Sequence, residues 1–214
     1  MLLLDERESV VDYCKKLISS ELTTGTGGNI SIYNREERLI AISPSGIEYD
    51  EMELEDVVVV DIEGNVVEGA KKPSSELGLH LALYKSNETV NAAVHTHSKY
   101  ATAISTLRIS LPVVHYLACL GGREVRCAPY ASFGTEELAQ HTVKTIGQDR
   151  AVFMANHGLI ALGENIKQAF GVAEQIEFVS EVYSIACTMG KPVELTEYEI
   201  DESLEKFKLY GQNR

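Results

Sequence analysis

Two different hydrophobic periods alternate along this chain, and together they restrict the folds open to it. Apolar residues recur at helical spacing over residues 7–20, whereas NISIY (29–33) and RLIAIS (38–43) alternate polar with apolar residues. These last two segments predict the strands of a hairpin. DVVVVDIEGNVVEG (56–69) predicts a buried strand, a Gly-Asn turn and a second short strand.

Helical patterns become more frequent after this region. SSELGLHLALYKS (74–86) carries an apolar helical stripe, TEELAQHTVKTIG (135–147) begins with a threonine cap, and a long amphipathic helix spans about 165–189. VNAAVHTHS (90–98) is instead typical of an extended strand. Because strands occur both in hairpins and beside helices, we predict an α/β fold with a mixed sheet covered by helices.

Size and charge limit the class of protein. A chain of 214 residues with 44% hydrophobic content can bury one substantial core, so we expect a single domain over residues 1–214. The net charge of -13 argues against a nucleic-acid partner. The opening MLLLDERESVV lacks the apolar stretch of a signal peptide, and no later apolar run approaches ~18 residues. We therefore expect a cytoplasmic protein with no membrane partner.

The segment AVHTHS (93–98) contains two histidines separated by one residue. On a strand, His95 and His97 would point to the same side, with their Cα atoms roughly 7 Å apart. That spacing suits two ligands of one metal ion, since zinc binds neutral imidazole nitrogen and catalytic zinc sites commonly use three protein ligands. A third ligand is therefore needed.

Four other histidines could supply that ligand, namely His80, His115, His141 and His157. His80 lies on an apolar helical stripe and His141 in the middle of an amphipathic helix, so both are interpreted as core or surface residues. His157 is favoured because AVFMANHGLIALG (151–163) places it at the end of an apolar strand, before a glycine that permits close backbone approach.

A carboxylate and several anion-binding turns accompany these histidines. KKPSSE (71–76) places Glu76 in the first turn of a helix, where it could serve in catalysis or merely complement the helix dipole. The paired serines before it, the loop TGTGGN (24–29) and the turn SPSG (43–46) offer hydroxyl and backbone N–H donors to a phosphate. A metal, a carboxylate and a phosphate cradle together favour aldol cleavage of a sugar phosphate.

Eight motifs extend this interpretation, and together they resemble the class II aldolase and epimerase family, which includes the adducin head. The resemblance covers about Arg7 to Gly211, and is strongest to members that act on L-fuculose 1-phosphate. It rests on GTGGNIS, SPSGI, PSSE, VHTHS, LPVVHY, GGREVRCAPYASFGT, NHGLIALG and EKFKLYG. The resemblance implies three layers, with helices on both faces of a mostly antiparallel mixed sheet, and assembly as a fourfold-symmetric homotetramer.

The resemblance also implies roles for individual residues. It implies one Zn²⁺ per subunit, held by His95, His97 and His157, with Glu76 as a further ligand in the empty site and as the acid/base once substrate displaces it. The implied reaction splits L-fuculose 1-phosphate into dihydroxyacetone phosphate and L-lactaldehyde through a metal-stabilised enediolate. Phosphate contacts are implied for Gly28, Asn29, Ser45, Gly46, Ser74 and Ser75.

A neighbouring subunit is implied to complete each active site. In the family, the residue matching Tyr116 reaches the next subunit's site and acts as the proton donor on the aldehyde side. Phe133, Phe207 and Tyr210 are implied to shape that pocket, so residues of about 200–214 form a C-terminal tail near the active site. From hydrophobic pattern alone, these aromatic residues would be interpreted as core or tail residues.

Other functions remain open at the level of sequence. A sister enzyme, such as an L-ribulose-5-phosphate 4-epimerase or another deoxyhexulose-phosphate aldolase, would use the same metal and phosphate parts. A noncatalytic module like the adducin head would be expected to lack the metal ligands and the carboxylate. Cupins and carbonic anhydrases also contain paired histidines, but their β-rich patterns do not match the helices predicted here.

Overall fold

One sheet of eight strands organises residues 1–209, which are the residues that the computed structural model describes. The strand order is β4-β3-β2-β1-β5-β8-β7-β6, and all neighbours are antiparallel except β6 and β7. The strands are β1 (Asn29–Asn34), β2 (Leu39–Ile42), β3 (Val58–Asp61), β4 (Val66–Glu68), β5 (Ala92–Thr96), β6 (Cys127–Ala128), β7 (Ala151–Met154) and β8 (Gly158–Gly163).

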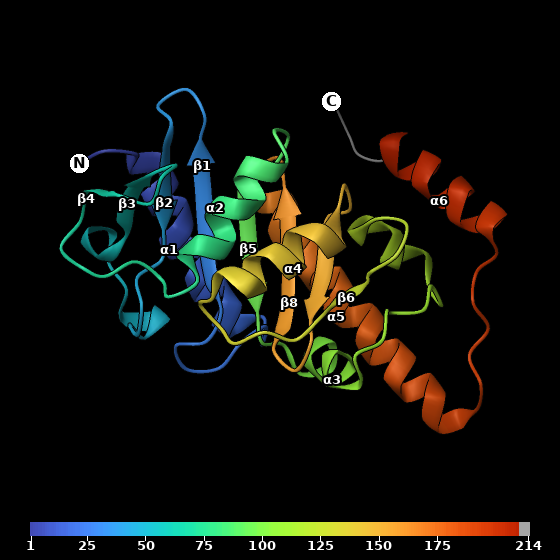
Figure 1. The fold of residues 1–214 in the computed structure, drawn as a ribbon. Helices are drawn as coiled ribbons and strands as arrows, with labels where there is room; N and C mark the ends of the chain where they lie inside the picture. Colours follow the sequence, from blue (N-terminus) through green and yellow to red (C-terminus); the bar gives the residue numbers. More distant parts are fainter. Residues whose placement is uncertain (210–214) are drawn as a thin grey trace.

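Helices cover both faces of this sheet, as Figure 1 shows. The helices are α1 (Leu4–Ser19), α2 (Leu77–Ser86), α3 (Lys99–Leu107), α4 (Glu136–Ile146), α5 (Ile166–Met189) and α6 (Glu197–Leu209), with 3-10 turns η1 (Tyr49–Glu51), η2 (Leu54–Asp56) and η3 (Tyr116–Gly121). α2 and α4 pack on one face, and α1, α3 and α5 on the other. The predicted three-layer α/β fold with a mixed, mostly antiparallel sheet is confirmed.

The central strands are apolar on both sides because helices cover both faces. In β5, Val94 packs into the core shared with α1 and α5, whereas its neighbour Ala93 packs toward α2 and α4. In β8, Leu159 packs into the core shared with α1 and α5, and Ile160 packs toward α2 and α4. This alternation follows from the two-residue period of a strand. It also determines which side chains of β1 and β5 face α2.

Two helix starts differ from the sequence prediction. α1 begins at Leu4, before the apolar pattern that starts at residue 7, and the buried guanidinium of Arg7 in its first turns donates to the carbonyl oxygens of Leu54 and Val57. α2 begins at Leu77, so Glu76 is the residue that precedes the first turn, not part of it. Its side chain makes no capping hydrogen bond, which leaves the carboxylate available for other contacts.

The C-terminal helix lies apart from the sheet and packs against η3 (Figure 1). The guanidinium of Arg123 forms ion pairs with Glu197 and Asp201 of α6. Further along α6, the ring of Phe207 stacks on that of Tyr116, with 6.0 Å between ring centroids. Within residues 1–209, no helix is both long and apolar enough to cross a membrane.

Candidate metal centre and active site

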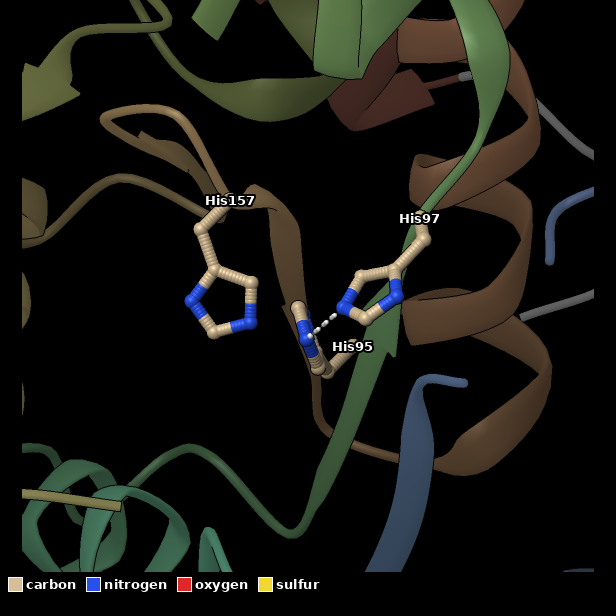
Figure 2. A group of neighbouring side chains, drawn as sticks. All are labelled: His95, His97 and His157. Atoms are coloured by element: carbon tan, nitrogen blue, oxygen red, sulfur yellow. Dashed lines mark hydrogen bonds between the residues drawn. The ribbon is translucent and has the colours of Figure 1, made fainter. Parts of the chain in front are cut away.

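Three imidazole rings converge at the ends of β5 and β7 (Figure 2). His95 lies in β5, His97 is the first residue after that strand, and His157 lies in the turn between β7 and β8. Each ring offers a nitrogen, and these three nitrogens lie within 4.8 Å of one another. The two motifs that were predicted to share one metal site are therefore brought together in space.

The protonation pattern of His95 favours a cation at this point. Its Nδ1–H donates to the carbonyl oxygen of Leu159 at 2.8 Å, so its Nε2 carries a lone pair. That Nε2 lies 3.2 Å from Oε2 of Glu76 and 2.9 Å from Nε2 of His97. Lone pairs from imidazole and carboxylate thus face one another. Such a donor set fits a divalent metal ion, which would satisfy all of them at once.

Burial keeps these histidines in the neutral form that a metal requires. Desolvation is the largest influence at each ring: it lowers the pKa of His95 and His97, and it lowers the pKa of His157 to about 4. Neutral imidazole is the ligating species, and protonation competes with metal binding. At neutral pH the three nitrogens are therefore available as ligands.

The carboxylate of Glu76 lies next to the three imidazole rings of this cluster. It is buried, and its Oε2 accepts a hydrogen bond from Nδ2 of Asn29 at 2.9 Å. Burial alone would raise the pKa of Glu76, but the electrostatic interactions with the His95 and His157 rings and the hydrogen bond from the amide of Asn29 outweigh burial and lower that pKa. Its other oxygen, Oε1, lies 3.5 Å from Nε2 of His157. The carboxylate is therefore ionised and faces the metal position.

Sheet register explains why these side chains meet. Asn29 of β1 lies directly opposite His95 of β5 in their antiparallel pairing. Residues opposite each other across two strands point to the same face. That face is covered by α2, and Glu76 lies immediately before the first turn of this helix. Segments separated by more than 45 residues in sequence thus supply adjacent parts of one site.

A cavity of about 480 Å³ opens beside this cluster. None of the residues that line it is lysine or arginine, so an anion there would be bound by hydroxyl and backbone N–H groups. The two serine-containing loops lie side by side through a β-bridge between Pro44 and Pro73. The lining residues are Thr26, Gly27, Gly28, Asn29, Pro44, Ser45, Gly46, Ser74, Ser75, Glu76, His97, Tyr130, Ala131, Phe133, Asn156 and His157.

The Gly28 position tolerates no side chain. Its φ is +71°, and an added Cβ would lie 2.5 Å from the carbonyl oxygen of His95. Its own carbonyl oxygen accepts a hydrogen bond from the buried hydroxyl of Tyr49 at 2.6 Å. This loop is therefore fixed closely against the strand that carries the histidines.

Some predicted residues lie outside this cavity. Tyr116 and Phe207 contact each other at a different surface, and neither lines the cavity of their own chain. The side chain of Tyr116 is 51% exposed, which leaves it free to contact another molecule. His115 lies next to Tyr116 and takes no part in the histidine cluster. Tyr210 lies outside the described residues.

Sequence reasoning missed a polar contribution from α2. It interpreted His80 as an ordinary core or surface histidine, but this buried ring hydrogen-bonds to Asn29 and Ser31 behind the carboxylate. The available signal was spacing, since residues four apart share one side of a helix. His80 follows Glu76 by four residues, and Tyr84 follows His80 by four. The cavity also includes Tyr130 and Asn156, which were given no role.

Comparison with known proteins gives consistent matches. The family described as Class II Aldolase and Adducin N-terminal domain matches residues 8–184. A 5-deoxy-D-ribulose 1-phosphate aldolase from Bacillus thuringiensis is 54% identical over 212 residues, 99% of this chain and 100% of that protein. An L-fuculose phosphate aldolase from Escherichia coli is 38% identical, covering 94% of each chain. A solved L-fuculose 1-phosphate aldolase structure matches with a TM-score of 0.95 at 43% identity, covering 97% of this chain and 98% of that one.

Proposed function

The chain belongs to the class II aldolase and adducin N-terminal domain family, and from this premise we propose that it cleaves a ketose 1-phosphate between C3 and C4. The products are dihydroxyacetone phosphate and a short aldehyde. The observation that carries the proposal is the convergence of His95, His97, His157 and Glu76 beside a cavity lined by hydroxyl and glycine residues.

The metal is proposed to be zinc, at one ion per subunit. Three neutral imidazoles with a carboxylate form a donor set that suits zinc, which leaves a position for substrate when the carboxylate moves away. When bound, the metal polarises the ketose carbonyl and offsets the negative charge that develops on its oxygen as the carbon–carbon bond breaks. His95, His97 and His157 would hold it throughout the reaction.

Glu76 is proposed to move the proton at C3. In condensation it removes a proton from C3 of dihydroxyacetone phosphate, and in cleavage it returns that proton to the same carbon. Its Oε2 is held by Asn29, whereas Oε1 accepts no hydrogen bond from the described residues. An ionised carboxylate with one free, buried oxygen is suited to this exchange.

The phosphate is proposed to bind in the cradle formed by the three loops. The contacts come from the backbone and hydroxyl groups of residues that line the cavity, and they hold the substrate by its unreactive end. The hydroxyl of Ser74 accepts a hydrogen bond from the N–H of Glu76 at 3.2 Å, so its own hydrogen remains available. The proposed phosphate contacts are Gly28, Asn29, Ser45, Gly46, Ser74 and Ser75.

The substrate is proposed to end in a methyl group. The Bacillus thuringiensis relative is named for 5-deoxy-D-ribulose 1-phosphate, whose cleavage leaves acetaldehyde, and the Escherichia coli relative for L-fuculose phosphate, whose cleavage leaves L-lactaldehyde. Ala131 and Phe133 supply an apolar wall of the cavity that suits a methyl group. We rank 5-deoxy-D-ribulose 1-phosphate first because of the higher identity, and retain L-fuculose 1-phosphate as the second candidate because of the solved structure.

One product analysis tests the reaction and ranks the substrates. The zinc-loaded protein is incubated with dihydroxyacetone phosphate and either acetaldehyde or L-lactaldehyde, and the products are identified by NMR. The values of kcat/KM for the two ketose 1-phosphates are then compared with that for epimerisation of L-ribulose 5-phosphate at C4. A larger value for epimerisation would favour the sister enzyme. No turnover, together with no zinc, would favour a noncatalytic module.

The assembly is proposed to be a homotetramer of fourfold symmetry with its active sites between subunits. The support from this chain is that Tyr116 is half exposed and lies outside the cavity of its own subunit. A phenol hydroxyl can donate its proton to an aldehyde oxygen in condensation. A rotationally assembled ring would present it, together with Phe207, to the neighbouring subunit's site.

A further inference from the structure

A buried row of polar side chains lies behind Glu76, away from the cavity. Asn29 donates to the carboxylate, and Oδ1 of the same amide lies 2.5 Å from Nε2 of His80. On the other side of that ring, Nδ1 lies 2.6 Å from the hydroxyl of Ser31. The hydroxyl of Tyr84 lies 2.6 Å from the same Ser31 oxygen. The four side chains behind the carboxylate come from only two elements, β1 and α2.

The hydrogen positions in this row follow from the chemistry of its members. Because Nδ2 of Asn29 donates to Glu76, its Oδ1 is the atom that faces His80 and must accept. His80 therefore carries its hydrogen on Nε2. A neutral imidazole then accepts at Nδ1, so the hydroxyl of Ser31 donates to it. Each group therefore donates to the next one: Ser31 to His80, His80 to Asn29, and Asn29 to the carboxylate of Glu76.

We propose that His80 is a positioning residue, which fixes the amide of Asn29 so that its N–H always faces Oε2 of Glu76. This inference rests on the proposed function, in which Glu76 moves a proton. An amide can rotate by half a turn without changing its shape. Rotation here would place Oδ1 of Asn29 against the carboxylate and its NH₂ against the N–H of His80. Both contacts would be repulsive, so His80 selects the productive orientation.

The neutral state of His80 supports this role. The ring is completely buried, and this burial is the largest of the influences that together lower its pKa to about 4. Near neutral pH the ring therefore has one donor and one acceptor, as the row requires. Fixing Oε2 in this way leaves Oε1 of Glu76, which lies 3.5 Å from Nε2 of His157, as the carboxylate oxygen without a hydrogen-bond donor among the described residues.

Two variants of His80 separate positioning from packing. His80→Leu fills the space without a donor, and should lower kcat by roughly 10- to 100-fold per zinc-loaded site, the range for outer-shell partners of a metal site. KM for the ketose 1-phosphate should change less, by about twofold, because His80 does not line the cavity. His80→Gln places an amide N–H near the position of Nε2 and should recover most of the lost kcat.

A buried residue of the same helix provides the matched control. Leu83 of α2 is fully buried in the core between α2 and the sheet and has no polar contact with Asn29. Leu83→Ala should lower thermal stability while kcat per zinc-loaded site stays close to that of the unchanged protein. If kcat depended only on how well α2 is packed, it would fall in Leu83→Ala as well as in His80→Leu.

A double-variant cycle tests whether His80 acts through Asn29. Adding His80→Leu to Asn29→Ala should cause little further loss of kcat, because the amide that His80 orients has already been removed. The proposal is overturned if the two losses multiply, if His80→Gln is as impaired as His80→Leu, or if His80→Leu loses stability but keeps its kcat.

One spectroscopic measurement does not depend on turnover. In ¹⁵N-labelled metal-free protein, long-range ¹H–¹⁵N NMR spectra should show His80 with hydrogen on Nε2 and none on Nδ1 near pH 7. The opposite tautomer would overturn the proposal even if the aldolase reaction is confirmed. If the expected tautomer is found but no ketose 1-phosphate is cleaved, the orientation of Asn29 stands and the proposed function fails.

Discussion

Nε2 of His157 lies 3.5 Å from Oε1 of Glu76, although the two residues are 81 positions apart in the sequence. That oxygen accepts no hydrogen bond from the residues that the structure describes. A buried, ionised oxygen without a donor is costly unless a cation or a proton satisfies it. In the proposed reaction, this pair therefore links the metal site with the carboxylate that moves the proton.

His157→Ala should remove the metal. Losing one of three imidazole ligands should reduce the zinc content, measured by elemental analysis, from about one per chain to a small fraction of that. Far-UV circular dichroism should stay near that of the unchanged protein, because His157 lies in a turn. His141→Ala in α4 is the control and should keep its zinc. Full zinc retention in His157→Ala would show that the ligand is another residue.

Glu76→Gln should separate proton transfer from binding. Turnover should fall by roughly 100-fold or more, as is typical when a general base is lost. Dihydroxyacetone phosphate should still bind by calorimetry, but the exchange of its C3 hydrogen with solvent deuterium should be strongly slowed in NMR spectra. Glu88→Gln makes the same charge change at an exposed position and should leave exchange unaltered. Exchange at the normal rate in a zinc-loaded Glu76→Gln protein would place the base elsewhere.

Gly158→Ala should disturb the site through the backbone. An added Cβ would lie 2.3 Å from the carbonyl oxygen of Thr96 and 3.1 Å from Cδ2 of His97. Relieving this overlap should cost about 1–3 kcal/mol of unfolding free energy in urea titrations, and zinc affinity in a chelator competition should weaken. Gly171→Ala in α5 meets no atom within 4 Å and should instead add roughly 0.5–1 kcal/mol. Equal stability of the two variants would contradict the crowding at Gly158.

The stability of the metal-free protein should depend on His80 below neutral pH. Its pKa is lowered to about 4 in the folded state, with burial as the largest cause, whereas an unfolded histidine has a pKa near ~6.5. Between these values the unfolded chain binds a proton that the folded chain does not, so stability falls as the pH falls. The contribution of this one group reaches about 3 kcal/mol near pH 4.

The measurement is a set of urea titrations of the metal-free protein and of His80→Leu at several pH values. His80→Leu lacks this proton uptake, so its unfolding free energy should fall less steeply between about pH 6.5 and pH 4. The two curves should therefore approach each other as the pH is lowered. A constant difference over this window would mean that His80 becomes charged in the folded state as readily as in the unfolded one.

Mixing two inactive variants tests the shared active site. Glu76→Gln and Tyr116→Phe should each have low activity, but unfolding and reassembling them together at equal amounts should restore activity. If subunits combine at random and each site draws these residues from two chains, roughly a quarter of the sites regain both residues. Reassembly is verified by size. Activity that stays at the mean of the two variants would assign both residues to one chain.

Local sequence was sufficient to predict the main elements and to place the first two candidate ligands on one side of a strand. The two-residue period of the central strands indicated burial on one or both faces, and the same period placed His95 and His97 on one side of their strand. The helices α4 and α5 begin after the capping residues Thr135 and Asn165, as their sequences indicate. Each of these features depends on neighbours within a few residues, which a sequence displays directly.

The contacts between distant residues came only from the tertiary fold. The sequence favoured His157 as the third candidate ligand because it ends an apolar strand, and the return of β8 beside β5 is what brings it to the cluster. The family resemblance implies a phosphate contact for Asn29, whereas sheet register places its amide between Glu76 and His80. Contacts of this kind depend on how strands pair and how a helix packs across them, and neither is encoded in local spacing.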